Sequence, residues 1–176
     1  GFQVGTSLVP IVPAAVIFDL WVDDFSDSNA ANPRGARIRP DMQAGYSACE
    51  AASTGPVEQG NVGAGAGATL GKLNGPDCAM KGGIGHASVQ VGPWVVGAMI
   101  ACNAVGDVID PDSGQIVAGA RKAQGMGLLN TQAALLAGQS RAPRLMPGTH
   151  TTIGVIATNA KLSKAQAQRL ALSGHD

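Results

Sequence analysis

The chain has 176 residues, the length of one domain, and a chain of this size can bury roughly 68–70% of its unfolded surface without a disulfide or metal staple. Twelve Lys and Arg residues balance twelve Asp and Glu residues, and this zero net charge argues against a nucleic-acid or anionic-membrane partner, which would need clustered surplus cations. Hydrophobic residues make up 45% of the sequence and charged residues 14%, which excludes an intrinsically disordered chain.

The first elements are predicted from apolar runs and turn signals. Residues 9–21 (VPIVPAAVIFDLW) are predicted as one or two buried strands. The polar stretch over residues 23–39 is predicted as a loop. A helix is expected to open at residues 39–41 (RPD), with Pro in its first turn, and to run to about Ala52 with several small Ala side chains suited to close packing.

Glycine dominates residues 55–92, where 11 of the 38 residues are Gly. Each Gly costs about 1 kcal/mol in a helix interior, so this run is predicted as a long loop whose backbone approaches another group closely. Two strands are expected around its end, at residues 87–91 and 94–103. The second is apolar on both faces and should therefore be internal in a sheet.

The C-terminal part of the chain carries clearer local signals. Three segments are expected here: a hairpin over residues 107–117 with its turn at 111–114, a weak and partly helical stretch over 120–143, and a strand over 151–158. A final helix is predicted after Ser163, because Ser163 and Gln166 form a capping box. Gly174 lies where the C-cap of that helix belongs.

Targeting and cysteine patterns predict a cytoplasmic protein. The longest apolar stretch, residues 94–105, is far short of the ~20 residues that a membrane span needs, and no signal-peptide pattern is present. Cys49, Cys78 and Cys102 have no CxxC spacing, which favours small buried thiols over a disulfide or zinc site. The chain begins abruptly and stops directly after the last helix, so we expect it to be part of a longer protein, incomplete at both ends.

The sequence lacks several common functional motifs. The segment GAGATLGKL misses the phosphate-loop pattern, because Leu73 follows Lys72 where a hydroxyl residue should hold magnesium. The same glycines also miss GxGxxG, and the GxSxG motif of α/β-hydrolases is absent. The three His residues are scattered and form no metal-binding pair, so no metal site is expected.

One arrangement does suit catalysis, at residues 147–160. A Gly-containing approach meets a hydroxyl residue, Thr151, at the start of the predicted strand. Such a hydroxyl can cut the peptide bond that precedes it, and the freed α-amine, with a pKa of about 7.7–8.0, can then serve as the base for the same hydroxyl. Thr-Thr pairs also open ordinary strands, so the residues alone leave both interpretations open.

Four segments together resemble the L-aminopeptidase/D-esterase (S58-type) family of self-cleaving N-terminal-nucleophile hydrolases, which includes β-peptidyl aminopeptidases and nylon-oligomer hydrolases. They stand in the order that the family has and extend over most of the chain. The segments are residues 14–20 (AAVIFDL), 63–73 (GAGAGATLGKL) continuing to 80–85 (MKGGIG), 103–110 (NAVGDVID) and 148–154 (GTHTTIG) with residues 155–168.

The resemblance implies an α/β fold, a four-layer αββα sandwich formed by one domain over residues 1–176. Its precursor would cleave itself at His150–Thr151, giving a larger part, 1–150, and the start of a smaller part at Thr151. Thr151 would then be the nucleophile.

The same comparison by motif assigns four further residues. Lys72 matches a lysine beside the nucleophile, whose charge lowers the pKa of the α-amine or hydroxyl. Asn103 matches an asparagine that helps to bind the oxyanion. Phe18 and Gly71 are expected to contact substrate. Without the resemblance, Lys72 also fits a solvated loop lysine and Asn103 a strand-end cap.

Three departures from the family pattern stand out. Phe18 occupies a place where part of the family has Tyr, so no phenol can donate a hydrogen bond there. His150 precedes the expected nucleophile, where Asn is frequent. A further acidic or hydroxyl pair of the family belongs beyond Asp176, the last residue here.

The function that these observations predict is hydrolysis of short peptides, amino-acid amides or oligoamides through an ester on Thr151. The resemblance implies that the protein needs no metal or cofactor. It also implies a small peptide or amide substrate and a homo-oligomer. Two alternatives stay open. One is an acyl transferase of the ornithine acetyltransferase type, and the other is a non-catalytic fragment or homologue.

Overall fold

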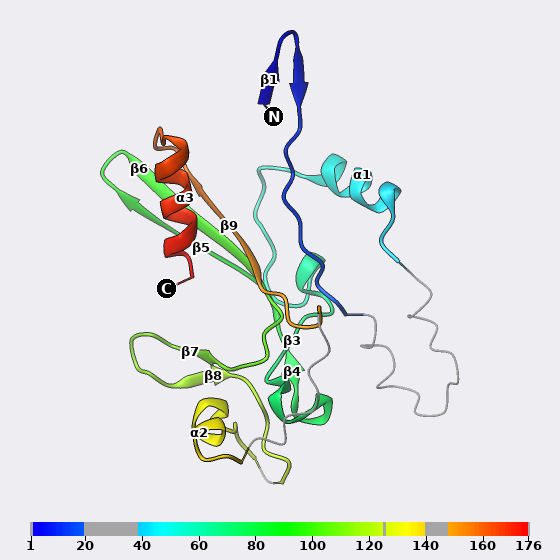
Figure 1. Cartoon of the computed structure of the whole chain (residues 1–176), viewed down its shortest axis with the longest axis vertical. Helices are drawn as coiled ribbons and strands as arrows, with labels where there is room; N and C mark the ends of the chain where they lie inside the picture. Colours follow the sequence, from blue (N-terminus) through cyan, green and yellow to red (C-terminus); the bar gives the residue numbers. More distant parts are fainter. Residues whose placement is uncertain (1, 20–38, 125, 140–147, 176) are drawn as a thin grey trace.

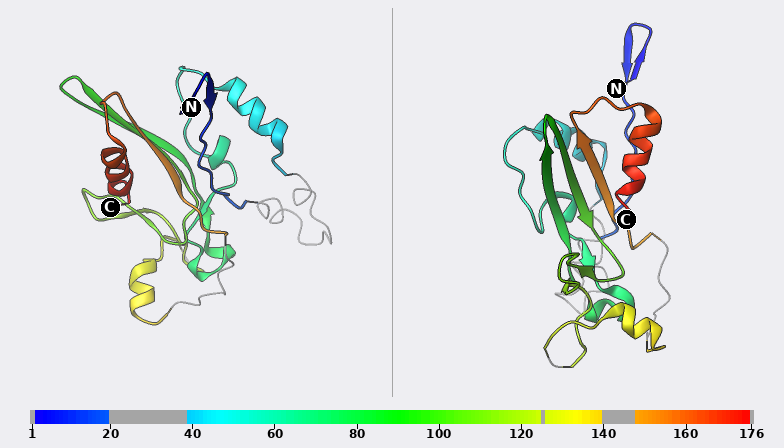
Figure 2. Two further views of the ribbon diagram at one scale, coloured as in Figure 1. Left: turned by 45° about the horizontal axis from the view of Figure 1, so that its top comes forward. Right: turned by 90° about the vertical axis from the view of Figure 1, so that its left-hand side faces the viewer.

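Figure 1 shows the computed structural model of the chain, which describes residues 2–19, 39–124, 126–139 and 148–175. These residues form an α/β fold built around a three-stranded antiparallel sheet with the strand order β5-β6-β9. Helix α3 lies beside β9 along one face of this sheet (Figure 2). Among the described helices, none has the length and apolar character needed to cross a membrane.

The three-stranded sheet is set by a tight hairpin. β5 (Gly83–Val91) pairs with β6 (Trp94–Cys102) through a two-residue turn in which Gly92 has φ +58. Positive φ at the first turn residue favours Gly and matches the twist of the flanking strands. β9 (Ile153–Thr158) pairs with the other edge of β6, which confirms the prediction that the strand from residue 94 is internal.

Three smaller antiparallel pairs and several short helices complete the described structure. The pairs are β1 (Phe2–Val4) with β2 (Ser7–Val9), β3 (Thr69–Leu70) with β4 (Met80–Lys81), and β7 (Val108–Ile109) with β8 (Ile116–Ala118). The α-helices are α1 (Met42–Ala51), α2 (Thr131–Leu136) and α3 (Lys164–Ser173). Single 3₁₀ turns are η3 (Gly63–Gly65), η4 (Lys72–Asn74) and η5 (Pro76–Cys78).

Capping and turn signals placed several elements correctly. The Asp41 side chain accepts a hydrogen bond from the Ala44 N–H and caps α1, as expected of a helix opening at residues 39–41. The capping box of Ser163 and Gln166 is present at the start of α3. The hairpin over residues 107–117 is confirmed by β7 and β8, and the partly helical stretch is confirmed by α2.

Two expectations about strands are wrong. Val9 ends β2, and residues 10–19 form no helix or strand, because Pro10 and Pro13 lack the N–H that a ladder requires. β5 begins at Gly83, inside the segment predicted as a loop. A Cβ at Gly83 would lie 2.8 Å from the Gly60 carbonyl oxygen, so these glycines permit close backbone approach within a strand. The strand expected over residues 151–158 is confirmed by β9, which begins two residues later than expected, at Ile153. The loop predicted over residues 23–39 lies almost wholly outside the described residues.

Much apolar surface remains open. The accessible area is 13327 Å², whereas a compact monomer of 17.6 kDa exposes about 7,900 Å². Helix α1 buries no residue, although its Ala positions were expected to pack closely, and Val155 on β9 is 67% exposed. Cys49 is exposed as well, contrary to the expectation of buried thiols. The predicted burial of 68–70% is therefore not reached, because locally formed elements such as α1 leave their side chains exposed within the described residues.

Candidate active site

Backbone hydrogen bonds and the conformation of Gly71 fix the backbone at Lys72. Gly71 has φ +66, and the N–H groups of Gly71 and Lys72 donate to the carbonyls of Gly106 and Val105 at 3.1 and 2.9 Å. On the other side, a Cβ at Gly71 would lie 2.0 Å from the Ala120 nitrogen. Only Gly fits this position, and the turn that it allows directs the Lys72 side chain into the interior.

The Lys72 ammonium is buried and fully hydrogen-bonded. Its residue is 6% exposed, and Nζ donates to Asn103 Oδ1 at 2.6 Å, to the Asn103 carbonyl at 3.3 Å and to the Thr149 carbonyl at 3.0 Å. Three acceptors match the three N–H bonds of an ammonium group. The alternative of a solvated loop lysine is therefore wrong.

Burial also changes the acidity of Lys72. Desolvation disfavours the charged form and lowers the pKa of Lys72 to about 8, while the nearby Cys102 acts in the opposite direction. None of the three acceptors is a carboxylate, so no full negative charge in direct contact offsets the burial. Lys72 can therefore change its protonation state close to neutral pH.

Asn103 connects Lys72 to the segment before Thr151. It follows β6 directly and is completely buried, with 0% exposure. Its Oδ1 accepts from Lys72 Nζ and from the Thr69 N–H at 3.0 Å, while its Nδ2 donates to the Thr149 carbonyl at 3.3 Å. The side chain thus does more than cap a strand, because it orients the ammonium and shares one acceptor with it.

The segment at residues 148–151 contacts Lys72 and Asn103 through its backbone. Gly148 has φ +83, and Thr149 is 3% exposed, with its carbonyl oxygen held by Lys72 and Asn103. The Thr149 hydroxyl lies 2.9 Å from Nε2 of His150. Burial and the charge of Lys72 lower the pKa of His150, so its imidazole favours the neutral form. Thr151 follows, half-buried, ahead of β9.

The structure therefore brings together part of the site expected from the sequence. Lys72 and Asn103 are in direct contact, and both hold the carbonyl two residues before Thr151. Sequence reasoning missed Thr149, because its contribution is a backbone oxygen that any residue type could supply. Phe18 is half-buried outside any helix or strand, and its contact with substrate stays a prediction, as does that of Gly71.

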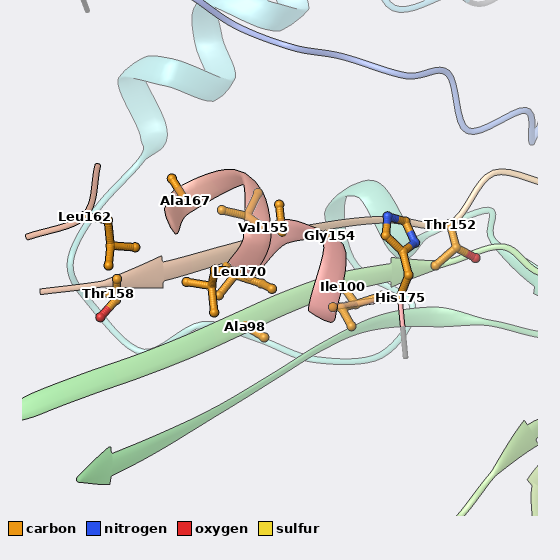
Figure 3. A pocket seen from close by; sticks show the side chains of 13 residues that line it. Ala98, Ile100, Thr152, Gly154, Val155, Thr158, Leu162, Ala167, Leu170 and His175 are labelled. Carbon is orange, nitrogen blue, oxygen red and sulfur yellow. The ribbon is translucent and has the colours of Figure 1, made fainter. Parts of the chain in front are cut away.

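An apolar groove lies between α3 and the sheet, close to this segment. It has a volume of 410 Å³, and Figure 3 shows Ile100 and Leu170 in it, with Thr152 and His175 together at one end. Thr152 directly follows Thr151, so the groove begins beside the expected nucleophile in the chain. No group of three His, Cys, Asp or Glu residues that could hold a metal ion occurs in the described part of the chain.

Gly71→Ala is expected to be strongly destabilising. The substitution combines a left-handed backbone with a Cβ placed against the Ala120 nitrogen, whereas Gly92→Ala tests the backbone effect alone, since nothing lies within 4 Å of its Cβ. A residue forced into a sparsely populated backbone region costs about 1–3 kcal/mol, and the steric clash adds to that at Gly71. Urea unfolding should show the larger loss for Gly71→Ala. Equal losses in the two variants would contradict the close approach of Ala120.

Comparison with known proteins identifies a family and several relatives of this chain. The sequence profile of peptidase family S58 matches residues 3–176. An uncharacterized aminopeptidase of Mycobacterium leprae is 38% identical over 178 residues, which is 96% of this chain and 44% of that protein. An uncharacterized aminopeptidase of Mycobacterium tuberculosis is 36% identical over 100% of this chain and 47% of its own length. A 6-aminohexanoate-oligomer endohydrolase of Agromyces sp. is 28% identical over 99% of this chain and 46% of its own length. The chain spans less than half the length of these relatives.

Proposed function

The chain belongs to peptidase family S58, and from this premise we propose that it is part of an amide hydrolase that cuts itself at His150–Thr151 and then uses Thr151 as its nucleophile. The family resemblance expected from the four sequence segments is thus confirmed, and with it membership of an aminopeptidase and amide-hydrolase family. The observation that carries the finer proposal is the convergence of Lys72 and Asn103 on the Thr149 carbonyl.

Self-cleavage would begin at the peptide bond after His150. The Thr151 hydroxyl attacks the His150 carbonyl carbon, and collapse of the tetrahedral intermediate breaks the C–N bond, which leaves an ester on Thr151 Oγ1 and a free α-amine. Water then hydrolyses the ester, which gives a carboxylate on His150 and restores the hydroxyl. In this scheme Lys72 and Asn103 anchor the chain on the N-terminal side of the scissile bond, through the Thr149 carbonyl.

Turnover would reuse the same groups. The Thr151 α-amine accepts the hydroxyl proton, and Oγ1 attacks the amide carbonyl of the substrate. After cleavage the Thr149 carbonyl moves away from Asn103, and Asn103 Nδ2 can then donate a hydrogen bond to the oxyanion. The charge of Lys72 lowers the pKa of the Thr151 α-amine. The leaving amine takes the proton, and water releases the acyl group from Thr151. Short peptides, amino-acid amides and oligoamides all fit this chemistry.

The whole protein is proposed to build on the part described above. We propose a four-layer αββα sandwich in which further layers cover the open face of the β5-β6-β9 sheet, with residues 1–150 and 151–176 belonging to the two products of cleavage. A homo-oligomer is proposed as well. The comparisons give no support to the acetyltransferase alternative. Hydrolysis without acetyl transfer to ornithine is the result that distinguishes the two activities.

Hydrolysis by the full-length protein is expected to rise and then fall with pH. The rise reports loss of the proton from the Thr151 α-amine, whose ordinary pKa of about 7.7–8.0 is lowered by the Lys72 charge. The fall follows because the pKa of Lys72 is about 8, so above that pH the ammonium is lost, and with it the charged hydrogen bond that orients Asn103, the proposed oxyanion donor. The measurement is kcat/KM across about pH 5 to 10, which reports groups of the free enzyme. A 6-aminohexanoate oligomer and an amino-acid anilide serve as substrates.

Lys72→Met provides the matched variant for this profile, because it keeps the length of the stem and removes the charge. The rising limb should shift to higher pH, towards the ordinary α-amine pKa of about 7.7–8.0, and the falling limb above about pH 8 should disappear. An unchanged profile in Lys72→Met would contradict the role proposed for Lys72. Absence of hydrolysis of either substrate by the full-length protein would contradict the proposed function itself.

A further inference from the structure

Asp107 is a half-buried carboxylate that the mechanism above does not use. Its Oδ1 accepts from the Ala120 N–H at 3.0 Å and from the Thr131 hydroxyl at 2.7 Å, and its Oδ2 accepts from the Thr131 N–H at 2.7 Å. A Cβ at Gly119 would lie 2.0 Å from Oδ1, so backbone packs directly against the carboxylate. The three donors are neutral groups, and they come from segments that are distant in sequence.

These hydrogen bonds join the parts of the chain that surround the candidate site. Asp107 lies in the turn that begins at Asn103, Ala120 is fully buried, and Thr131 begins α2 and is buried too. Hydrogen bonds to an ionised acceptor are roughly twice as strong as those between neutral groups. The three hydrogen bonds of Asp107 therefore add to the backbone hydrogen bonds that hold these segments together.

The same segments enclose the backbone of Lys72 on both sides. On one side, Gly71 and Lys72 donate to the carbonyls of residues 105 and 106, immediately before Asp107. On the other side, Gly71 lies against Ala120, whose N–H is held by Asp107. A displacement of either side moves the start of the Lys72 side chain.

We propose that Asp107 is a positioning residue, which fixes the Lys72 ammonium against Asn103 and the Thr149 carbonyl by holding the backbone on both sides of Gly71. The inference rests on the proposed function for its effect on catalysis. Groups at an active site must be held within about 0.5 Å of the productive geometry. Asp107 acts here through the backbone, without hydrogen-bonding the ammonium itself.

The titration of Lys72 provides a readout of this position. Two titratable groups act electrostatically with the ammonium: Cys102 at the end of β6, and His150, whose own pKa is lowered by Lys72. Thr131→Val removes one donor to Asp107 without changing any charge. A shift in the Lys72 titration in this variant would thus report movement of the ammonium, and not the loss of a neighbouring charge.

The test compares four substitutions in the full-length protein. Asp107→Asn removes one acceptor, and Thr131→Val removes the hydroxyl donor, whereas Thr131→Ser retains it. Asp110→Asn is the matched control: this carboxylate lies three residues further along the chain and accepts hydrogen bonds within its own turn, from the Asp112 N–H and the Ser113 hydroxyl. Self-cleavage rate, kcat and KM are measured for each variant.

We expect Asp107→Asn to lower the self-cleavage rate and kcat by roughly 10- to 100-fold, because a misplacement of about 1 Å can cost that much. KM should stay within about twofold, and Thr131→Val should lie between Asp107→Asn and the wild type. Thr131→Ser and Asp110→Asn should match the wild type. In a Thr151→Ala background, where activity plays no part, NMR titration of labelled lysine side chains should show a shifted Lys72 in Thr131→Val and none in Thr131→Ser.

Lower melting temperatures with unchanged kcat in Asp107→Asn and Thr131→Val, together with an unchanged Lys72 titration in Thr131→Val, would overturn the inference, since Asp107 would then be structural only. An uncut and inactive wild type would refute the proposed function instead. The NMR comparison of Thr131→Val with Thr131→Ser would still decide, in that case, whether Asp107 positions Lys72.

Discussion

Thr151→Ala is expected to leave the full-length protein uncut and without amide hydrolysis. The substitution removes the hydroxyl that we propose as the nucleophile of both steps, and the uncut chain would also keep its α-amine in a peptide bond. Removal of a catalytic nucleophile typically lowers kcat by roughly 10⁴-fold or more. Denaturing electrophoresis reports the cut, and an amide substrate reports turnover in the same preparation.

Two neighbouring variants make this result specific to Thr151. Thr151→Ser retains a hydroxyl and should still cleave itself and turn over substrate, at altered rates. Thr152→Ala removes the adjacent, exposed hydroxyl, which lies 4.0 Å from Cys102 Sγ, and should cleave normally. Cleavage in Thr151→Ala together with an uncut Thr152→Ala would move the nucleophile by one residue and contradict the assignment.

Asn103→Ala is expected to lower kcat by roughly 10²–10³, the effect of removing one oxyanion donor. It should also destabilise the fold, because the side chain is fully buried and its loss leaves the Thr69 N–H without an acceptor. A buried unsatisfied polar group costs about 1–3 kcal/mol. Thermal unfolding and steady-state kinetics of the same variant separate the two effects.

Asn103→Asp distinguishes an oxyanion donor from a structural acceptor. The aspartate keeps oxygen acceptors for Thr69 and Lys72, so stability should fall less than in Asn103→Ala, but it lacks the N–H that reaches the Thr149 carbonyl. We therefore expect kcat to stay low in Asn103→Asp. A near-normal kcat in this variant would show that the amide donor plays no part in catalysis.

Local sequence signals predicted the elements that depend on a few neighbouring residues. The capping box at Ser163 placed α3, and the apolar run from Trp94 placed the central strand. The contact between Lys72 and Asn103 joins residues 31 positions apart, so no local pattern could predict it. That both residues belong to one site was expected only because the motifs around them resemble those of one family, and their direct contact was not predicted.

The failures have physical causes that a single sequence does not reveal. Residues 83–86 form a strand despite their glycines, because pairing with β6 outweighs the low strand propensity of Gly. Thr149 takes part through its backbone carbonyl, which leaves no signature in the side chain. The role of Asp107 depends on donors 13 and 24 residues away, which the fold alone brings together.

The N-terminal sequence of the smaller fragment of the purified full-length protein tests the central claim most directly. Self-cleavage at His150–Thr151 predicts a fragment that begins Thr151-Thr152-Ile153, formed without any added protease and absent from Thr151→Ala. A chain that stays intact under denaturing mass spectrometry, or a fragment that begins at any other residue, would contradict the assignment of Thr151 as the nucleophile.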